Sequence, residues 1–242
     1  MRILANIAKL LIATAAAVAI LPFAAQAGVV GSRHDLSNGM GSAFPHGAPN
    51  VYTNYGQVCV YCHTPHSANT DNNGKLLWNR PFSTASYTLY SSPTSKLTPT
   101  QPTGASSSSA LCLSCHDGTI AVDSILRPPK QSYTVSTTHR RMDVSLAADS
   151  CGACHNEAGI PGPEKAFLGT DLSNDHPVNM IYDNTVNTGL APAATVTSAG
   201  LKLYEGNKVQ CATCHDPHNT NNGPFLRTSN AASALCQTCH TK

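Results

Sequence analysis

The chain has 242 residues, of which 12% are charged and 6% are aromatic, with 15 Lys plus Arg against 13 Asp plus Glu. This near-balance of charge argues against nucleic acid as a partner, because binding to phosphates needs a basic surface. Aromatic residues are too sparse to build an ordinary hydrophobic core for a chain of this length. We therefore expect another component to supply much of the core.

The first 27 residues have the composition of an export signal. Arg2 and Lys9 flank the start of an apolar run from Leu10 to Ile20, and Ala25-Gln26-Ala27 forms a small-x-small cleavage site. The run of eleven residues is too short for a membrane span. We expect residues 1–27 to be a signal peptide and residues 28–242 to be one exported domain without a membrane span.

Every cysteine in the chain belongs to a Cys-x-x-Cys-His motif, which is the attachment signature of c-type haem. Two thiols add to the two vinyl groups of one porphyrin, and the following His binds the iron as proximal ligand. A zinc ribbon needs such units in pairs, and a disulfide scaffold would show irregular spacings. The sequence therefore predicts five covalent haems, attached through Cys59, Cys62 and His63; Cys112, Cys115 and His116; Cys151, Cys154 and His155; Cys211, Cys214 and His215; and Cys236, Cys239 and His240.

The motifs are organised as a duplication with one addition. Residues 59–116 and 211–240 each hold two motifs and share a CH-x-P-H start, so each reads as a two-haem module. The motif at 151–155 stands alone between them. We expect a multihaem cytochrome c fold, mostly coil with short α-helices around a stacked haem core and little β-structure. Coil is expected at 82–109 and 184–200, and a strand at Tyr133 to Thr137.

Six histidines remain beyond the five proximal ones, which is enough to give every iron a second imidazole. His66 and His218 each lie three residues past a proximal His, too close to reach the far face of the same porphyrin. They are therefore expected to bind the iron of a neighbouring haem. His176, His34 and His139 are further candidates, and His46, in a turn-like loop, is the expected spare residue. For the motif at 151–155, the choice between His139 and His46 stays open.

The motifs together resemble those of the doubled-CXXCH multihaem cytochromes, which include filament-forming extracellular cytochromes of metal-reducing bacteria. The resemblance is carried by HDLS at His34, CVYCHTPH at Cys59, CLSCHDG at Cys112, NDHPV at Asn174, CATCHDPH at Cys211 and the terminal CQTCH. It implies closely packed bis-histidine haems that carry electrons, with His34, His66, His176 and His218 as distal ligands. The additional motif at 151–155 departs from the four-haem pattern.

These patterns predict an exported electron-transfer protein that is not an enzyme. Its partners would be redox proteins or extracellular electron acceptors, at the cell surface or, alternatively, in the periplasm. His34 lies in a Gly- and Ser-rich arm and is a candidate for donation to the next subunit of a homopolymer. The rival interpretation is a multihaem oxidoreductase acting on nitrogen compounds, which would need one iron with an open position.

Overall fold

Regular structure is sparse in the computed structural model, which describes residues 28–37, 51–71, 75–145, 147–153 and 166–241. The predicted signal peptide, His46, Cys154 and His155 lie outside the described residues. The described chain is mostly coil, as expected, and its regular elements are short. Among these residues no helix is long and apolar enough to cross a membrane.

Three of the four α-helices that the structure describes lie at haem-attachment motifs. The four are α2 (Ser109–His116), α3 (Ala193–Ser198), α4 (Cys211–Cys214) and α5 (Ala234–Cys239), with 3-10 helices at Lys75–Leu77, Gly104–Ser106, Cys151–Ala153 and Ala231–Ser233. The motifs that begin at Cys112, Cys211 and Cys236 lie on α2, α4 and α5. The motif at Cys59 is a turn instead. The expectation of a short helix around each motif is therefore confirmed for three of them and wrong for the first.

Two small sheets contain all the strands that the structure describes. Strand β1 (Thr88–Leu89) runs parallel to β2 (Asp171–Leu172), and β3 (Met180–Ile181) is antiparallel to β4 (Lys208–Val209). The strand predicted at Tyr133 to Thr137 is wrong: Thr134 makes only an isolated bridge to Asn54. Alternating Val and Thr favours a strand only where a neighbouring strand continues the pairing.

The two segments predicted as coil have different outcomes. Residues 82–109 are largely coil that packs on the protein: Tyr87 is buried, and Gln101 exchanges hydrogen bonds of 2.9 and 2.8 Å with its backbone. Within 184–200, however, α3 forms, so the prediction of coil is wrong there. Val196 on α3 is fully buried against Leu201, and this packing favours the helix although Thr and Val are weak helix formers.

The hydrophobic core consists of three small clusters instead of one. The cluster beside the first motif contains Tyr52, Tyr55, Val60, Tyr61 and Val122. The cluster beside α2 contains Tyr87, Leu113 and Leu172. The cluster beside α5 contains Tyr182, Leu190, Ala191, Val196, Leu201 and Val209. Each cluster thus supports a different attachment motif, which fits the expectation that bound groups complete the core.

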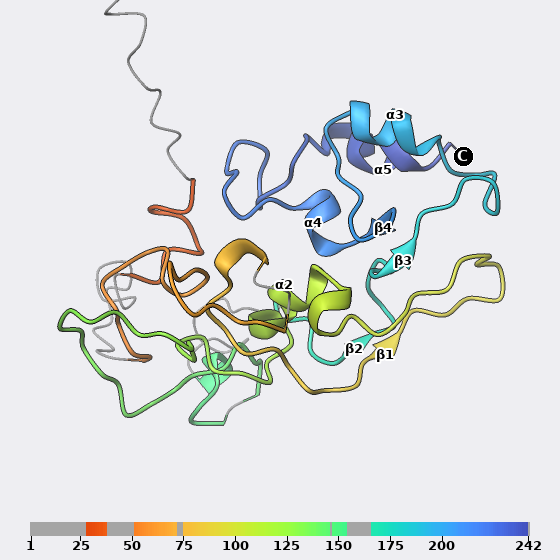
Figure 1. Cartoon of the computed structure of the whole chain (residues 1–242). Helices are drawn as coiled ribbons and strands as arrows, with labels where there is room; N and C mark the ends of the chain where they lie inside the picture. Colours follow the sequence, from red (N-terminus) through yellow and green to blue (C-terminus); the bar gives the residue numbers. More distant parts are fainter. Residues whose placement is uncertain (1–27, 38–50, 72–74, 146, 154–165, 242) are drawn as a thin grey trace, which may run out of the picture.

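A buried polar network joins α2 to α4. The Gln210 Oε1 accepts hydrogen bonds from the hydroxyls of Ser107 and Ser109, at 2.8 and 2.6 Å. The Ser109 hydroxyl oxygen in turn accepts the N–H of Cys211 at 3.0 Å. In Figure 1, α2 lies at the centre of the molecule, and α3, α4 and α5 form the neighbouring C-terminal part. The network therefore connects a motif of the first module directly to one of the second.

Candidate haem sites

At three motifs the backbone of the proximal histidine closes a turn onto the first cysteine. The N–H of His63 donates to the carbonyl of Cys59 at 2.8 Å, and the N–H groups of His215 and His240 donate to the carbonyls of Cys211 and Cys236 at 3.0 Å. The turn keeps the residues of one motif close together in space, as attachment of a single porphyrin requires.

The Nδ1 atoms of three proximal rings are held by backbone carbonyls. His63 Nδ1 lies 2.5 Å from Leu76 O, His116 Nδ1 lies 2.7 Å from Ala166 O, and His215 Nδ1 lies 3.2 Å from Pro224 O. A carbonyl oxygen only accepts, so Nδ1 carries the proton in each ring. Nε2 then has a free lone pair, which is the form of histidine that binds a metal.

The duplication in the sequence is also present in the structure. After each CH-x-P-H segment the chain returns along the motif: Asn79 donates to Cys62 O at 2.9 Å, and Arg227 donates to Cys214 O at 2.8 Å. Leu77 and Phe225, which occupy equivalent positions in the two loops, both have left-handed φ angles, of 51° and 58°. This uncommon conformation turns the loop so that the preceding carbonyl faces the proximal ring.

Three proximal rings each lie opposite a histidine from a distant part of the chain. The ring centres are 6.2 Å apart for His63 and His218, 6.1 Å for His116 and His34, and 6.4 Å for His240 and His176. In each pair the second member is one of the histidines that the sequence left over. His218 faces the motif of the other module, as its position three residues past His215 predicts.

These separations fit two imidazoles on opposite faces of one iron. A metal–imidazole bond of about 2 Å and a further ~1.2 Å from nitrogen to ring centre, doubled across the iron, give about 6.4 Å. The chemistry of the donors fits as well, because imidazole nitrogen is a common ligand of haem iron. The residues present therefore suit c-type haem, with thiols for attachment and imidazoles for the iron.

The ring of His34 is largely enclosed by the protein. Burial, together with the nearby His116, His215 and His218, lowers its pKa from 6.5 to about 4, so the ring is neutral and able to bind a metal. The ring stacks on Phe225 with a centre separation of 4.3 Å, and its buried Nδ1 has no hydrogen-bond partner among the described residues.

The arm that carries His34 is tied to the second module. The N–H of Gly28 donates to the carbonyl of His218 at 3.0 Å, and the ring of His34 faces His116 of the same chain. The interpretation of this arm as a free segment is therefore wrong. The donation of His34 to a neighbouring subunit gains no support from this placement, which favours a ligand within one chain.

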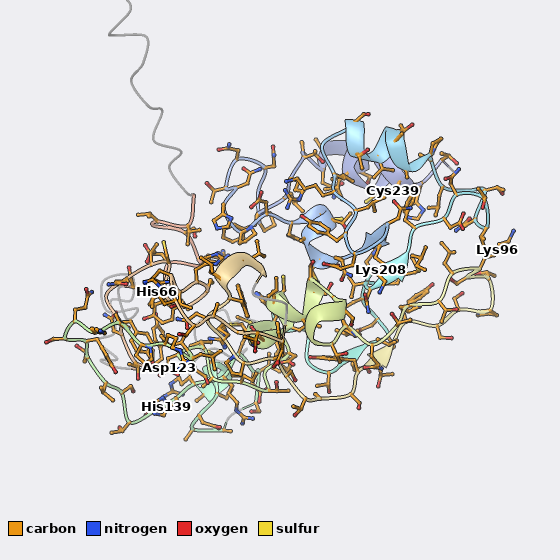
Figure 2. All side chains as sticks on the ribbon, in the orientation of Figure 1. His66, Lys96, Asp123, His139, Lys208 and Cys239 are labelled. Atoms are coloured by element: carbon orange, nitrogen blue, oxygen red, sulfur yellow. The ribbon has the colours of Figure 1, made fainter. Side chains whose placement is uncertain are left out.

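His139 is held by a buried carboxylate. Its Nδ1 lies 2.8 Å from Asp123 Oδ2; the Asp123 side chain is 1% exposed, whereas that of His139 is 58% exposed. Figure 2 shows the two residues side by side, at the opposite end of the molecule from Cys239. A carboxylate on Nδ1 is a common partner of a metal-binding histidine. Burial raises the pKa of Tyr52, and Cys151 and Asp123 are among the neighbours that add to this effect, so Cys151 lies in the same region.

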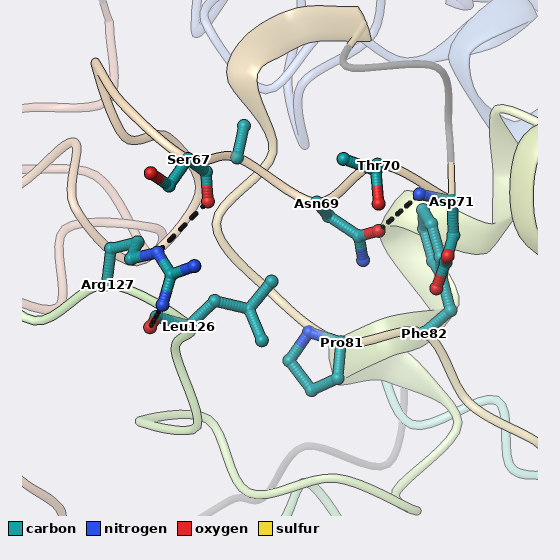
Figure 3. A pocket seen from close by; sticks show the side chains of 9 residues that line it. Ser67, Asn69, Thr70, Asp71, Pro81, Phe82, Leu126 and Arg127 are labelled. Atoms are coloured by element: carbon teal, nitrogen blue, oxygen red, sulfur yellow. Dashed lines mark hydrogen bonds between the residues drawn. The ribbon is translucent and has the colours of Figure 1, made fainter.

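His66 is exposed, and no second imidazole pairs with it among the described residues. Figure 3 shows a pocket that begins at the residue after it, where the Arg127 guanidinium donates to Ser67 O at 3.1 Å. The pocket is lined by Ser67, Ala68, Asn69, Thr70, Asp71, Pro81, Phe82, Leu126 and Arg127. His66 thus stands at the rim of a concave surface, and its predicted role as a ligand stays a prediction.

The ring of His176 is held by the backbone. Its Nδ1 lies 3.1 Å from the carbonyl of Pro177, which keeps the proton on Nδ1 and leaves Nε2 with the lone pair that binds a metal. The Oδ2 of the adjacent Asp175 is buried with no hydrogen-bond partner among the described residues, and burial raises the pKa of this carboxyl.

The thiols of different motifs approach one another. Cys112 and Cys211 are neighbours, and their interaction raises the pKa of Cys112 and lowers that of Cys211. Burial raises the pKa of Cys62 to about 12, and the nearby Cys115 adds to this effect. Burial also raises the pKa of Cys214 to about 11, with Cys239 as the next contributor. Groups attached at neighbouring motifs would therefore lie close together.

Sequence reasoning missed three residues that build these sites. Gln210 organises the α2–α4 contact, Asp123 holds His139, and Arg80 is buried beneath α2. The signal for Arg80 was its position in Trp78-Asn79-Arg80-Pro81, where a lone charge follows an aromatic residue. Nothing in the spacing of Asp123 or Gln210 indicated their partners.

Comparison with known families gives two matches, which together cover all five motifs. The family described as outer membrane cytochrome MtrC/MtrF-like, domains II/IV, matches residues 32–165, more than half of the chain. The doubled CXXCH motif family matches residues 205–242. No curated protein sequence matches the chain.

Proposed function

The chain belongs to the family of outer membrane cytochrome MtrC/MtrF-like domains II/IV, and on this premise we propose that it carries electrons along haems bound at its five motifs. It is a multihaem c-type cytochrome, and the resemblance to the doubled-CXXCH cytochromes is confirmed by the match at its C-terminal end. The finer parts of the proposal are the number of haems, their ligands and the place of action.

The observation that carries the proposal is the set of three imidazole pairs. Each pair joins the histidine of a motif to a histidine that no motif uses, at a spacing that one iron would span. In the proposal, His63 and His218, His116 and His34, and His240 and His176 each hold one iron. His155 and His215 are the remaining proximal ligands. His66 and His139 are candidates to face them, with His46 as the alternative to His139 for the motif at 151–155.

Two imidazoles on one iron favour electron transfer over substrate chemistry. A haem iron held by two histidines takes up and gives up one electron at low potential and has no open position. The protein contributes by fixing the rings: carbonyls hold three of the proximal Nδ1 atoms, and burial lowers the pKa of His34, His116 and His176. These rings therefore stay neutral and oriented, so little rearrangement accompanies a change of charge.

Contacts between motifs support a continuous route for electrons. Ser109 and Gln210 form a buried network that links α2 to α4 and so joins the two modules, and Cys112 and Cys211 are neighbours there. Cys62 lies near Cys115, and Cys214 near Cys239. The proposed order is therefore first motif, second, fourth and fifth, with the motif at Cys151 beside the first.

The place of action is proposed from the family. Its description names an outer membrane cytochrome, so we place this protein at the cell surface, where it would pass electrons to redox partners or extracellular acceptors. A homopolymer joined through His34 is the alternative assembly. The pairing of His34 with His116 within one chain supports a protein whose haems are complete without a neighbour.

Optical and redox titration of the purified holoprotein tests the proposal. We expect all haem to be low-spin in both oxidation states, to be reduced and reoxidised reversibly, and to bind little carbon monoxide. Stoichiometric binding of carbon monoxide to one haem, with turnover of nitrite or hydroxylamine, would contradict it and favour the multihaem oxidoreductase.

A further inference from the structure

Arg80 places a positive charge inside the protein. The residue is 1% exposed, and its guanidinium makes four hydrogen bonds. Nε donates to the Ser114 hydroxyl at 3.2 Å, and Nη2 donates to the carbonyls of Ser114 and Ala121 at 2.8 and 2.9 Å. Nη1 donates to the carbonyl of Val122 at 2.6 Å. All four acceptors are neutral.

No carboxylate balances this charge within the part of the chain that the structure describes. The two acidic residues next to these acceptors in the sequence have other partners: Asp117 accepts from Tyr87 at 2.6 Å, and Asp123 accepts from His139 at 2.8 Å. Burial of an unpaired charge is costly, so a neutral residue would serve better if packing were its only role.

Arg227, in the second module, differs from Arg80 because it pairs with a carboxylate. Arg227 occupies the second module next to the equivalent loop and donates to the Asp216 carboxylate at 3.0 Å, as well as to the Tyr204 hydroxyl. Its charge is therefore cancelled locally. The first module keeps a buried cation where the second keeps an ion pair.

The guanidinium lies against the second motif. Ser114, which accepts two of its hydrogen bonds, stands between Cys112 and Cys115 on α2. These two hydrogen bonds place the guanidinium beside the turn of α2 that carries Cys112, Cys115 and His116. In a buried site the field of such a charge is screened far less than at the surface.

We propose that Arg80 is a potential-setting residue: its buried, unpaired charge raises the reduction potential of the haem attached at Cys112 and Cys115. The reason is electrostatic. Reduction adds one negative charge to the haem, and a fixed cation nearby stabilises the reduced form. This inference rests on the proposed function, because it requires a haem at this motif. With a raised reduction potential, the haem at the second motif would hold an electron preferentially at the junction of the two modules.

The test is spectroelectrochemical titration of matched holoprotein variants. Arg80→Gln removes the charge and keeps hydrogen-bond donors, whereas Arg80→Lys keeps the charge. Arg127→Gln is the matched control, because Arg127 also donates to backbone carbonyls but is exposed. We expect Arg80→Gln to lower the midpoint potential of one component of the titration curve. Arg80→Lys and Arg127→Gln should leave that midpoint potential unchanged.

A second pair of variants addresses the same charge with Arg80 retained. Ser114→Asp places a carboxylate where the Ser114 hydroxyl accepts from Nε, and Ser114→Asn has the same shape without charge. Ser114→Asp should lower the midpoint potential of the same component, and Ser114→Asn should leave it unchanged. If Arg80→Gln fails to fold or to load haem, the difference between these two variants decides the inference.

Separate outcomes identify which claim fails. A wild-type protein without haem on Cys112 and Cys115, seen in peptide masses, would defeat the proposed function at this motif. If all haems are attached but neither Arg80→Gln nor Ser114→Asp lowers the midpoint potential of any component, the inference is wrong while the proposed function stands. An equal shift in Arg127→Gln would also overturn it, because the effect would then follow net charge and not the buried position.

Discussion

Replacement of His218 with Ala should alter the haem of the other module. The ring of His218 lies 6.2 Å from that of His63, with an angle of 17° between the ring planes, and its own proximal neighbour His215 is held separately by Pro224 O. The variant should therefore lose the second ligand at the haem attached to Cys59 and Cys62. The haem attached next to His218 in the sequence should stay low-spin.

The size of the effect follows from the number of sites. One pair out of five loses a ligand, so about a fifth of the haem iron should become high-spin, with carbon monoxide binding of about one equivalent per chain. The reduction potential of that haem should rise, because the second imidazole stabilises oxidised iron more than reduced iron. Added imidazole should restore the low-spin spectrum.

The assay is electron paramagnetic resonance with carbon monoxide titration, performed in two backgrounds. In a chain with Cys59→Ala and Cys62→Ala, which lacks the first haem, His218→Ala should produce no new high-spin signal. If the high-spin fraction appears equally in both backgrounds, His218 serves a different iron, and the interpretation of the ring pairs as shared irons is wrong.

Three further predictions concern folding and charge. Chain produced without haem attachment should show little ordered structure by circular dichroism, since the protein core is three small clusters; a native-like near-ultraviolet spectrum would contradict this. Tyr87→Phe removes the 2.6 Å hydrogen bond to the buried Asp117 carboxylate and should lower the free energy of unfolding by about 2 kcal/mol, measured as a shift of the guanidinium midpoint; an unchanged midpoint would refute it. Asp123→Asn removes the negative charge on the Nδ1 of His139 and should raise one haem potential, whereas the exposed control Asp149→Asn should not; equal shifts would remove the special role of Asp123.

The attachment motifs could be predicted from sequence because their chemistry is local. Two thiols and an imidazole within five residues define one haem, and no tertiary contact is needed to recognise them. The same locality underlies the prediction for His218, because three residues are too few to span a porphyrin. The CH-x-P-H repeat indicated a duplicated module, whereas the return loops that bring Leu76 O and Pro224 O to the proximal rings are seen only in the structure.

Features that depend on tertiary packing were not predictable. The pairing of His34 with His116 brings together segments far apart in the sequence, and a Gly- and Ser-rich arm gave no sign of its anchor on His218. Asp123 and Arg80 are single charged residues whose partners come from distant loops. Likewise, α3 forms in a stretch of weak helix formers because Val196 packs into a cluster, and packing overrides local propensity.

The measurement that tests the central claim most directly is the intact mass of the holoprotein under denaturing conditions. Only covalent groups survive denaturation, so the mass counts attached haems without regard to ligands or folding. The account predicts the polypeptide from Gly28 to Lys242 plus five haems, with no thiol left to react with an alkylating reagent. A mass with fewer haems and matching free thiols, or a protein that releases zinc on denaturation, would contradict it.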